Sequence, residues 1–314
     1  MLDLVFCGTP QFAVSTLEKL VGSGFQVKLV VTQPDRPSGR GMEVVASPVK
    51  RAALALDLPV IQPDKIKNNE EFRAQLQQIA PEAIIVVGYG RIIPQWMIDL
   101  PPLGNLNLHA ALLPKYRGAA PLQWAIAMGE QVTGVTTMRI NAGLDTGDIL
   151  QQVEEPIRRE DTAMTLAPRL AHAGAELMIS TLAGLKNRTI TLQPQDDTKA
   201  TLAPILKRED GQIDFARTAI DTWNRLRGFQ PWPGAFTKFR GKMLSIHAAT
   251  PAAAGTTVPP AHFAIDNDHL LLGFANGTTL DISELQLEGK KRMTARDFIN
   301  GYRPRSDEVL GAIP

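Results

Sequence analysis

The chain has 314 residues, more than one compact domain usually contains, so its length predicts two domains. Hydrophobic residues make up 44% and charged residues 21%, a composition that excludes a disordered chain and predicts a sizeable core. The formal net charge is only +1, which excludes nucleic-acid binding by bulk charge, so any such partner must be held by local basic patches.

The cysteine and histidine pattern argues against a metal site. Cys7 is the one cysteine, and its apolar surroundings favour a buried thiol rather than a nucleophile. The five histidines lack the paired spacing of zinc ligands, so we expect no metal. The N-terminus has no targeting pattern and no run is long enough to span a membrane. We therefore expect a cytoplasmic protein that does not bind membranes.

Short apolar runs alternate with helix-like stretches through the first half of the chain. The apolar runs predict strands, at residues 2–8, 25–33, 83–90, 105–114, 134–140 and 147–157. Amphipathic spacing predicts helices, at residues 8–20, 51–58, 70–79, about 120–128 and 162–185. Continuously apolar strands separated by helices are typical of a mostly parallel sheet covered on both faces. Residues 1–185 are thus predicted to form a Rossmann-like, doubly wound α/β domain.

The composition changes near residue 186. The segment 186–208 has five basic and two acidic residues without clear periodicity, which predicts a basic linker. A helix is predicted at roughly 216–227. Short β-like runs separated by turn residues follow, at 234–240, 243–249, 269–274 and 278–287. These runs predict a small β-barrel or sandwich over residues 209–314.

The turn after the first predicted strand tests a nucleotide-binding function. It reads GTPQFAV over residues 8–14, where Gly8 can form a tight turn and Pro10 can begin a helix. The turn lacks both the G-x-G-x-x-G glycines and the lysine of a phosphate-binding loop. A nucleotide-dependent oxidoreductase is therefore disfavoured despite the fold class.

An amide, an imidazole and a carboxylate are the candidates for chemistry. Asn107 and His109 alternate on one predicted strand, so their side chains share a face near its carboxyl end, where open α/β sheets bind ligands. Asp145 lies between Gly143 and Gly147 in a loop between two predicted strands, from which it could orient His109. Each motif has a structural explanation that is as good as the functional one: Asn107 and His109 could be a polar pair at the end of a sheet, and Asp145 could simply form a turn. The spacing of the three residues does not identify a reaction.

Several longer segments carry a resemblance. NLNLHAALLPKYRGAAPLQWAI (105–126) and MRINAGLDTGDIL (138–150) resemble the formyl-tetrahydrofolate-dependent transferase family. The branch of this family that acts on methionyl initiator tRNA is similar in other segments, at 8–20, 33–41, 229–242 and 290–303. The similar segments occur in the same order over nearly the whole chain.

The resemblance implies a set of site residues and a formyl donor, 10-formyltetrahydrofolate. The implied catalytic residues are Asn107, His109 and Asp145. The implied folate pocket contains the GLDTG loop and the residues Tyr89, Gly90, Ile92, Ala111, Leu112, Leu113 and Pro114. The family's C-terminal domain is an OB-like barrel that helps to hold the tRNA, which here corresponds to residues 209–314.

Basic side chains are the expected contacts to tRNA phosphates, which position the tRNA without reading its sequence. The resemblance implies that the loop after the second strand grips the acceptor end, with Arg40 the most important residue. The candidates are Arg36, Arg40, Lys207, Arg208, Lys290, Lys291 and Arg292. For each one, an ordinary solvated charge is the alternative. We expect a monomer.

Three positions depart from the family pattern. Ala111 replaces the usual serine before Leu-Leu-Pro, which removes a hydroxyl contact. Met42-Glu43-Val44 stands where further lysines are usual, so the loop Gln33–Arg51 carries four basic and two acidic residues. Arg91 occupies a position that is usually apolar in the tRNA branch.

The expected chemistry is formyl transfer to an amine. We expect the amide of Asn107, and the ring of His109 if it is protonated, to stabilise negative charge on the formyl oxygen. Asp145 would raise the pKa of His109 and could relay a proton, directly or through water, from the attacking amine to the folate nitrogen. A sugar-amine formyltransferase and a formyl-tetrahydrofolate hydrolase are alternatives with the same chemistry. A non-catalytic tRNA-binding protein is the alternative from a different class.

Overall fold

The computed structural model describes residues 2–38, 43–253 and 255–311. The chain forms two compact units: the first contains residues 1–121, 132–156 and 166–204, and the second contains residues 122–131, 157–165 and 205–314. Most of the segment 186–208 thus belongs to the first unit. Among the described residues, no helix combines the length and the apolar character needed to cross a membrane.

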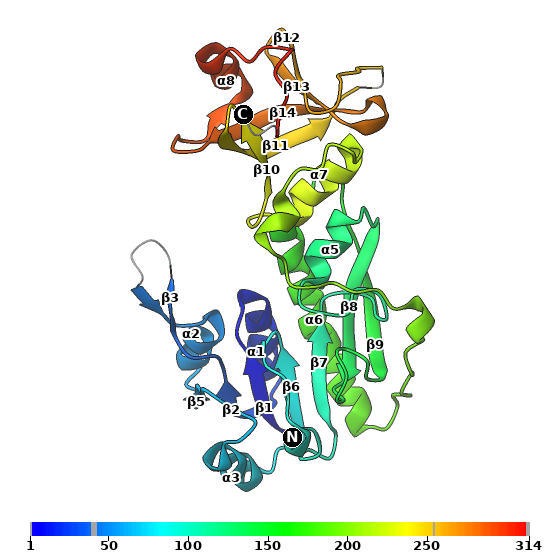
Figure 1. Ribbon diagram of the computed structural model, residues 1–314. Helices are drawn as coiled ribbons and strands as arrows, with labels where there is room; N and C mark the ends of the chain where they lie inside the picture. The colour runs from blue at the N-terminus through cyan, green and yellow to red at the C-terminus, as the bar shows by residue number, and fades with distance from the viewer. Residues whose placement is uncertain (1, 39–42, 254, 312–314) are drawn as a thin grey trace. The chain divides into compact units, whose positions relative to one another are not determined.

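The first unit is built on a seven-stranded sheet in the order β5-β2-β1-β6-β7-β8-β9 (Figure 1). Its strands are β1 (Asp3–Gly8), β2 (Gln26–Val31), β5 (Val60–Ile61), β6 (Ala83–Val87), β7 (Asn105–His109), β8 (Val132–Arg139) and β9 (Ile149–Pro156). The pairs from β5 to β7 are parallel, and β7–β8 and β8–β9 are antiparallel. The prediction of a mostly parallel sheet is confirmed, with an antiparallel edge.

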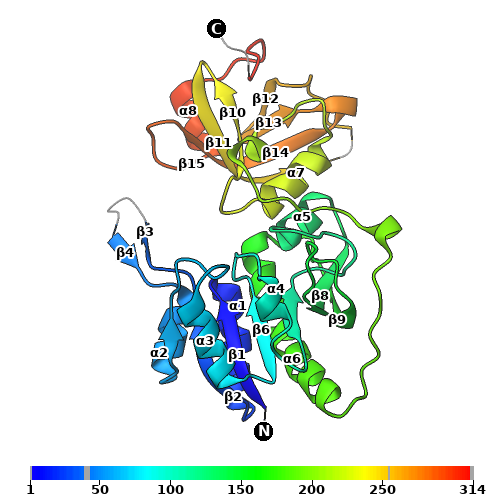
Figure 2. The same cartoon turned by 60° about the horizontal axis from the view of Figure 1, so that its bottom comes forward.

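Helices cover both faces of this sheet, as Figure 2 lets the reader follow. The helices of the first unit are α1 (Gln11–Gly22), α2 (Pro48–Ala55), α3 (Glu70–Ile79), α4 (Gln95–Ile98) and most of α6 (Ala163–Lys186). Val5 and Cys7 of β1 share a cluster with Phe72 of α3. Ala13 of α1 lies over Gly8, on the other face of β1, because side chains alternate along a strand. The doubly wound arrangement follows.

Some predicted boundaries differ from the structure. The strand predicted at 105–114 ends at His109, and the chain turns away through a cis peptide bond at Leu113–Pro114. The helix predicted at 51–58 begins at Pro48, because the Ser47 side chain caps it by accepting from the amide of Lys50. The predicted loop 34–48 contains a short hairpin of β3 (Arg36–Ser38) and β4 (Glu43–Val45).

The second unit contains a six-stranded antiparallel sheet in the order β10-β11-β14-β13-β12, with β15 on β14. Its strands are β10 (Ala235–Phe239), β11 (Lys242–Pro251), β12 (Phe263–Asp266), β13 (His269–Gly273), β14 (Thr279–Leu287) and β15 (Met293–Thr294). Its helices are α7 (Ala219–Gly228), α8 (Ala295–Tyr302) and most of α5 (Pro121–Ala127). Rings of Phe239, Phe263 and Phe298 meet in its core, at centroid distances of 5.3 to 6.1 Å. The predicted C-terminal domain of short strands is confirmed.

Candidate active site

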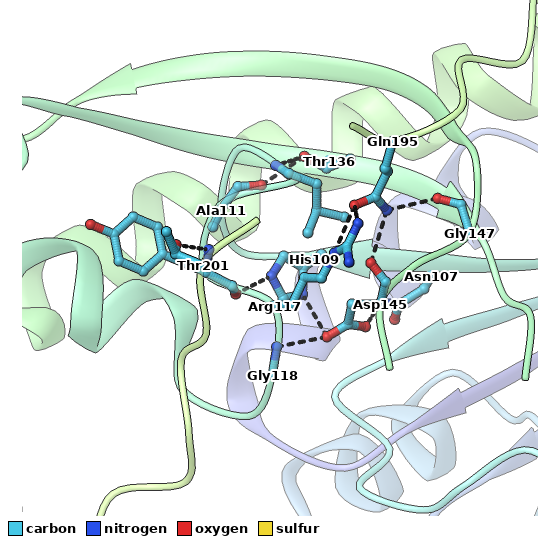
Figure 3. A network of polar contacts seen from close by, with 12 residues as sticks. Asn107, His109, Ala111, Arg117, Gly118, Thr136, Asp145, Gly147, Gln195 and Thr201 are labelled. Atoms are coloured by element: carbon cyan, nitrogen blue, oxygen red, sulfur yellow. Dashed lines mark hydrogen bonds and ion pairs between the residues drawn. The ribbon is translucent and has the colours of Figure 1, made fainter. Parts of the chain in front are cut away.

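Strand β7 carries two of the predicted catalytic side chains at the carboxyl edge of the sheet. Asn107 and His109 lie on one face of the strand, as their alternation predicts (Figure 3). Leu106 and Leu108 are buried on the other face, where Leu108 packs against Gly174 of α6. The apolar residues fix the strand, and this fixes the direction of the amide and the imidazole.

The loop between β8 and β9 brings Asp145 to the same place. Its carboxylate Oδ2 lies 3.6 Å from Nδ1 of His109, and its Oδ1 lies 3.5 Å from Nδ2 of Asn107. The amide of Gly118 donates to Oδ2 at 2.9 Å. Asp145 has a φ of 50°, a left-handed conformation that is uncommon in non-glycine residues and that aspartate adopts more readily than most. The structure therefore brings the three predicted side chains together.

Burial dominates the electrostatics of His109, whose side chain is only 5% exposed. Burial lowers the pKa of His109 below its ordinary value of 6.5, while the Asp145 carboxylate and the Tyr116 carbonyl counteract this only in part. Asp145 raises the pKa of His109, as expected, but burial lowers it by more. Because a carbonyl can only accept, Nε2 of the neutral ring carries the hydrogen and donates to the oxygen of Tyr116 at 2.9 Å.

Two side chains that the sequence did not suggest, Arg117 and Gln195, support the loop that carries Asp145. Arg117 is 6% exposed and donates to Oε1 of Gln195 from Nε and Nη2, at 3.0 and 2.7 Å. The side-chain nitrogen Nε2 of Gln195 donates to the backbone carbonyls of Asp145 and Gly147 at 2.8 and 2.7 Å (Figure 3). Arg117 lies in the turn PKYRG, residues 114–118, and Gln195 lies in the segment 186–208 that was predicted as a linker. A polar residue in a proline-containing turn was the available signal for Arg117, and Gln195 had none.

Apart from the GLDTG loop, which contains Asp145, the residues of the implied folate pocket lie on two segments, which follow β6 and β7. Tyr89 is buried, Gly90 has a φ of 76°, and Ile92 is 92% exposed. The Gln33 side chain donates to the carbonyls of Tyr89 and Gly90, at 2.9 and 3.2 Å, and so holds this segment.

The second segment is tied to β8. The hydroxyl of Thr136 makes two hydrogen bonds to this segment. Its Oγ1 donates to the carbonyl of Ala111 at 2.7 Å and accepts from the backbone amide of Leu113 at 3.2 Å. Ala111 is buried, and Leu112 and Pro114 are partly buried. The backbone around Ala111 is thus fixed by Thr136, without the hydroxyl that the family's usual serine would add.

The predicted tRNA contacts are distributed over both units. Arg36 is exposed on β3, and Arg40 lies outside the described residues. Lys207, Lys290 and Lys291 are exposed in the second unit.

Two arginines of the second unit have protein partners. Arg208 lies over the ring of Phe236 at 5.9 Å and donates to the sulfur of Met243. The backbone amide of Met243 in turn donates to the carboxylate of Glu288, in the turn that leads to Lys290. Arg292 forms an ion pair with Glu284. The second unit therefore places Arg208 beside the turn that carries Lys290 and Lys291. In the part of the chain that the structure describes, no group of three or more His, Cys, Asp or Glu side chains could hold a metal ion.

Comparisons with known proteins point to one family over both units. The family described as formyl transferase matches residues 3–182, and the formyl transferase C-terminal domain matches residues 205–303. The chain is 67% identical to a protein of Koribacter versatilis named methionyl-tRNA formyltransferase, over 99% of both chains. It is 61% identical to a protein of the same name from Acidobacterium capsulatum, over 99% of this chain and all of that one.

Solved structures of similar fold are more distant in sequence. The sugar 3N-formyltransferase WlaRD has a TM-score of 0.67 at 19% identity, over 93% of this chain and 99% of that one. An N-formyltransferase from Helicobacter canadensis has a TM-score of 0.66 at 21% identity, over 90% of this chain and 99% of that one. At this level of identity the two structures bear on the fold alone.

Proposed function

This chain belongs to the formyl transferase family, and from that premise we propose that it transfers the formyl group of 10-formyltetrahydrofolate to the free amine of methionyl initiator tRNA. The product is the formylmethionyl-tRNA that starts translation. The observation that carries the chemistry is the convergence of Asn107, His109 and Asp145 at the carboxyl edge of β7. The full-length relatives named methionyl-tRNA formyltransferase support the choice of acceptor.

The attacking group needs little activation. An ordinary α-amine has a pKa of about 8, so an appreciable fraction of the methionyl amine is neutral near pH 7. The larger task is to stabilise the negative charge that develops on the formyl oxygen as nitrogen adds to the carbon. The side-chain amide of Asn107 can donate to this oxygen, because only one of its two hydrogens faces Asp145.

The His109–Asp145 pair is suited to move the proton. The lowered pKa of His109 makes the neutral ring the resting form, with its Nδ1 lone pair on the side of Asp145. That nitrogen can accept the proton that the amine loses, and the carboxylate stabilises the imidazolium that forms. The proton then goes to the folate nitrogen as its bond to the formyl carbon breaks, so one C–N bond forms, one breaks and the proton count balances.

The surroundings of the trio fit a folate donor. Ile92 and Leu144 are large apolar side chains that are 92% and 64% exposed, on loops that follow β6 and β8. The flat pterin ring of a folate has apolar faces that such side chains can cover. The exposed backbone at Gly90 offers polar groups for the ring edge.

The N-terminal and C-terminal parts of the chain have separate roles in this proposal. Residues 1–185 supply the formyl transfer chemistry, and residues 209–314 hold the tRNA through phosphate contacts from Lys290, Lys291 and Arg292. The set of basic contacts is completed by Lys207 and Arg208 at the start of the second unit, by Arg36 on β3, and by Arg40. The protein acts as a monomer in the cytoplasm.

A direct acceptor assay tests the function. Labelled 10-formyltetrahydrofolate is offered with methionyl initiator tRNA or with a nucleotide-linked amino sugar, and transfer of the label is measured. We expect label on the tRNA alone, and a loss of about 10²–10³-fold in rate for Asn107→Ala. Label on the sugar, or release of formate without an acceptor, would replace the proposal with one of the other formyl-folate activities. Transfer that is unchanged in both Asn107→Ala and His109→Ala would refute the assigned site.

A further inference from the structure

The segment 193–203, which we call the strap, forms backbone hydrogen bonds with residues of the active site near both of its ends. At one end, Gln193 exchanges two backbone hydrogen bonds with Ile149, directly after the Asp145 loop, at 2.9 and 3.0 Å. At the other end, the amide of Arg117 donates to the carbonyl of Thr201, and the amide of Ala203 donates to the carbonyl of Arg117, both at 2.8 Å. The strap therefore joins the Asp145 loop to the turn that contains Arg117.

Between these two ends of the strap, the side-chain amide of Gln195 forms hydrogen bonds through both its oxygen and its nitrogen. Its oxygen accepts twice from the buried guanidinium of Arg117, and its nitrogen donates to the carbonyls of Asp145 and Gly147. The reverse orientation would set an NH₂ group against the guanidinium and an oxygen against two carbonyl oxygens. Arg117 thus fixes the orientation of Gln195, and Gln195 holds the backbone of the Asp145 loop.

The strap also reaches the other partner of His109. The Oγ1 atom of Thr201 accepts from the amide of Tyr116 at 2.8 Å, and the carbonyl of Tyr116 accepts from Nε2 of His109. Tyr116 has a φ of 60° and Asp145 a φ of 50°, so both partners of the imidazole have a left-handed backbone conformation that is uncommon in non-glycine residues. The strap supplies a hydrogen bond at each position.

We propose that Gln195 is a positioning residue for the formyl transfer, which acts by holding the Asp145 carboxylate against His109. The inference rests on the proposed function for its kinetic consequences. Gln195 contacts the backbone of the loop and not the reacting atoms, so its loss displaces the carboxylate without removing it. A misplacement of about 1 Å in a catalytic group can cost about 10²-fold in rate.

Two substitutions of Gln195 separate the bonds it makes. Gln195→Met and Gln195→Glu keep the length of the side chain and remove both donors, and only glutamate keeps an acceptor for Arg117. We expect kcat to fall about 10- to 100-fold in both variants, with KM for folate and for methionyl-tRNA changed by less than about threefold. The control is Gln151→Met, since Gln151 is a partly buried glutamine of β9 that accepts from Thr181 of α6 outside the site. A wild-type kcat in Gln195→Glu would overturn the proposal.

A double-mutant cycle tests whether Gln195 acts through Asp145. If it does, Gln195→Met combined with Asp145→Asn has the rate of Asp145→Asn alone, because the carboxylate that Gln195 positions is already gone. Rates that multiply would show that Gln195 acts independently, and would overturn the proposal.

A titration of His109 by NMR keeps this test separate from the proposed function, since it requires no activity. Gln195→Met should lower the pKa of His109, because the carboxylate that raises it moves away, and Gln151→Met should leave this pKa unchanged. An unchanged pKa in Gln195→Met would overturn the inference even if the wild-type protein formylates methionyl-tRNA. A lowered pKa in a protein that does not formylate methionyl-tRNA would refute the proposed function and leave the positioning of Asp145 supported.

Discussion

Nδ1 of His109 faces Oδ2 of Asp145 at 3.6 Å, in a site where the ring's other nitrogen already donates to a carbonyl. Both nitrogens thus face acceptors, which is the geometry of an imidazolium, while burial favours the neutral ring. The two influences oppose each other, and the carboxylate is the one that a single substitution can remove.

Asp145→Asn should lower the pKa of His109 further. The substitution removes the negative charge that favours the imidazolium and leaves the burial that disfavours it, so the pKa moves farther below 6.5. The pKa is measured from the chemical shifts of the His109 ring as the pH is varied. Asp148→Asn is the matched control, because Asp148 lies in the same loop and does not contribute to the pKa of His109. An equal or higher pKa in Asp145→Asn would contradict the assigned pair.

The stability of the protein should decrease below pH 6.5 partly because of His109. The pKa of His109 is lower in the folded protein than its ordinary value of 6.5 in an unfolded chain. The unfolded state therefore binds the proton more readily, so the contribution of the neutral ring is present above pH 6.5 and is lost as the pH falls below it. The free energy of unfolding is measured by urea denaturation at several pH values between 7.5 and 5.

His109→Gln provides the comparison for this pH dependence. A glutamine does not titrate, so the variant should lose less stability than the wild type over the same interval. His269, whose pKa is raised by its hydrogen bond to Asp281, has the opposite pH dependence and is common to both proteins. Parallel curves for wild type and His109→Gln would show that the pKa of His109 is not lowered.

Gly147→Ala should distort the Asp145 loop. A Cβ atom at Gly147 would lie 1.9 Å from the carbonyl oxygen of Arg139, in backbone that has no flexible end to move. We expect a loss of about 1–3 kcal/mol in unfolding free energy and a lower kcat, since the loop must shift as a whole. Gly22→Ala, at the end of α1, has open space for its Cβ and should leave both quantities unchanged or slightly raise the stability. Equal behaviour of the two variants would contradict the close approach at Gly147.

The sequence was sufficient for the elements that are governed by local pattern. The apolar runs at β1, β6 and β7 predicted the parallel centre of the sheet, and alternation along β7 predicted that Asn107 and His109 share a face. The direction of β8 and β9 could not be predicted, because β8 is buried along most of its length, like the parallel strands, and only the first two residues of β9 are buried.

The second layer of the site depends on contacts that local pattern does not encode. Gln195 is 50 residues from Asp145 and 78 residues from Arg117 along the chain. A glutamine in a polar segment has the same local pattern whether it is solvated or bonded to a buried loop. The protonation of His109, which the sequence left open, depends on both kinds of information: the nearby charge could be anticipated from the loop, and the extent of burial could not.

The turn from Gly289 to Arg292 should contribute to tRNA affinity through Lys290 and Lys291. Both side chains are exposed, and substituting them removes charge that could meet phosphates while it leaves the ion pair of Arg292 with Glu284 intact. Each phosphate contact that is lost should reduce the slope of log affinity against log salt by about 0.7–0.9. Lys290→Ala/Lys291→Ala should therefore bind methionyl-tRNA more weakly at low salt and converge with the wild type at high salt, as measured by filter binding.

The control for this prediction removes the same charge elsewhere. Lys65 and Lys67 are exposed in the segment that precedes α3, so Lys65→Ala/Lys67→Ala changes the net charge equally without touching the turn at 289–292. If net charge alone governed the affinity, the two double variants would have the same salt slope. A smaller slope in Lys290→Ala/Lys291→Ala alone assigns the phosphate contacts to the turn. The slope depends on the number of counterions released from the tRNA, and a basic side chain releases counterions only where it contacts a phosphate. Identical slopes in all three proteins would exclude these lysines from the tRNA-binding surface.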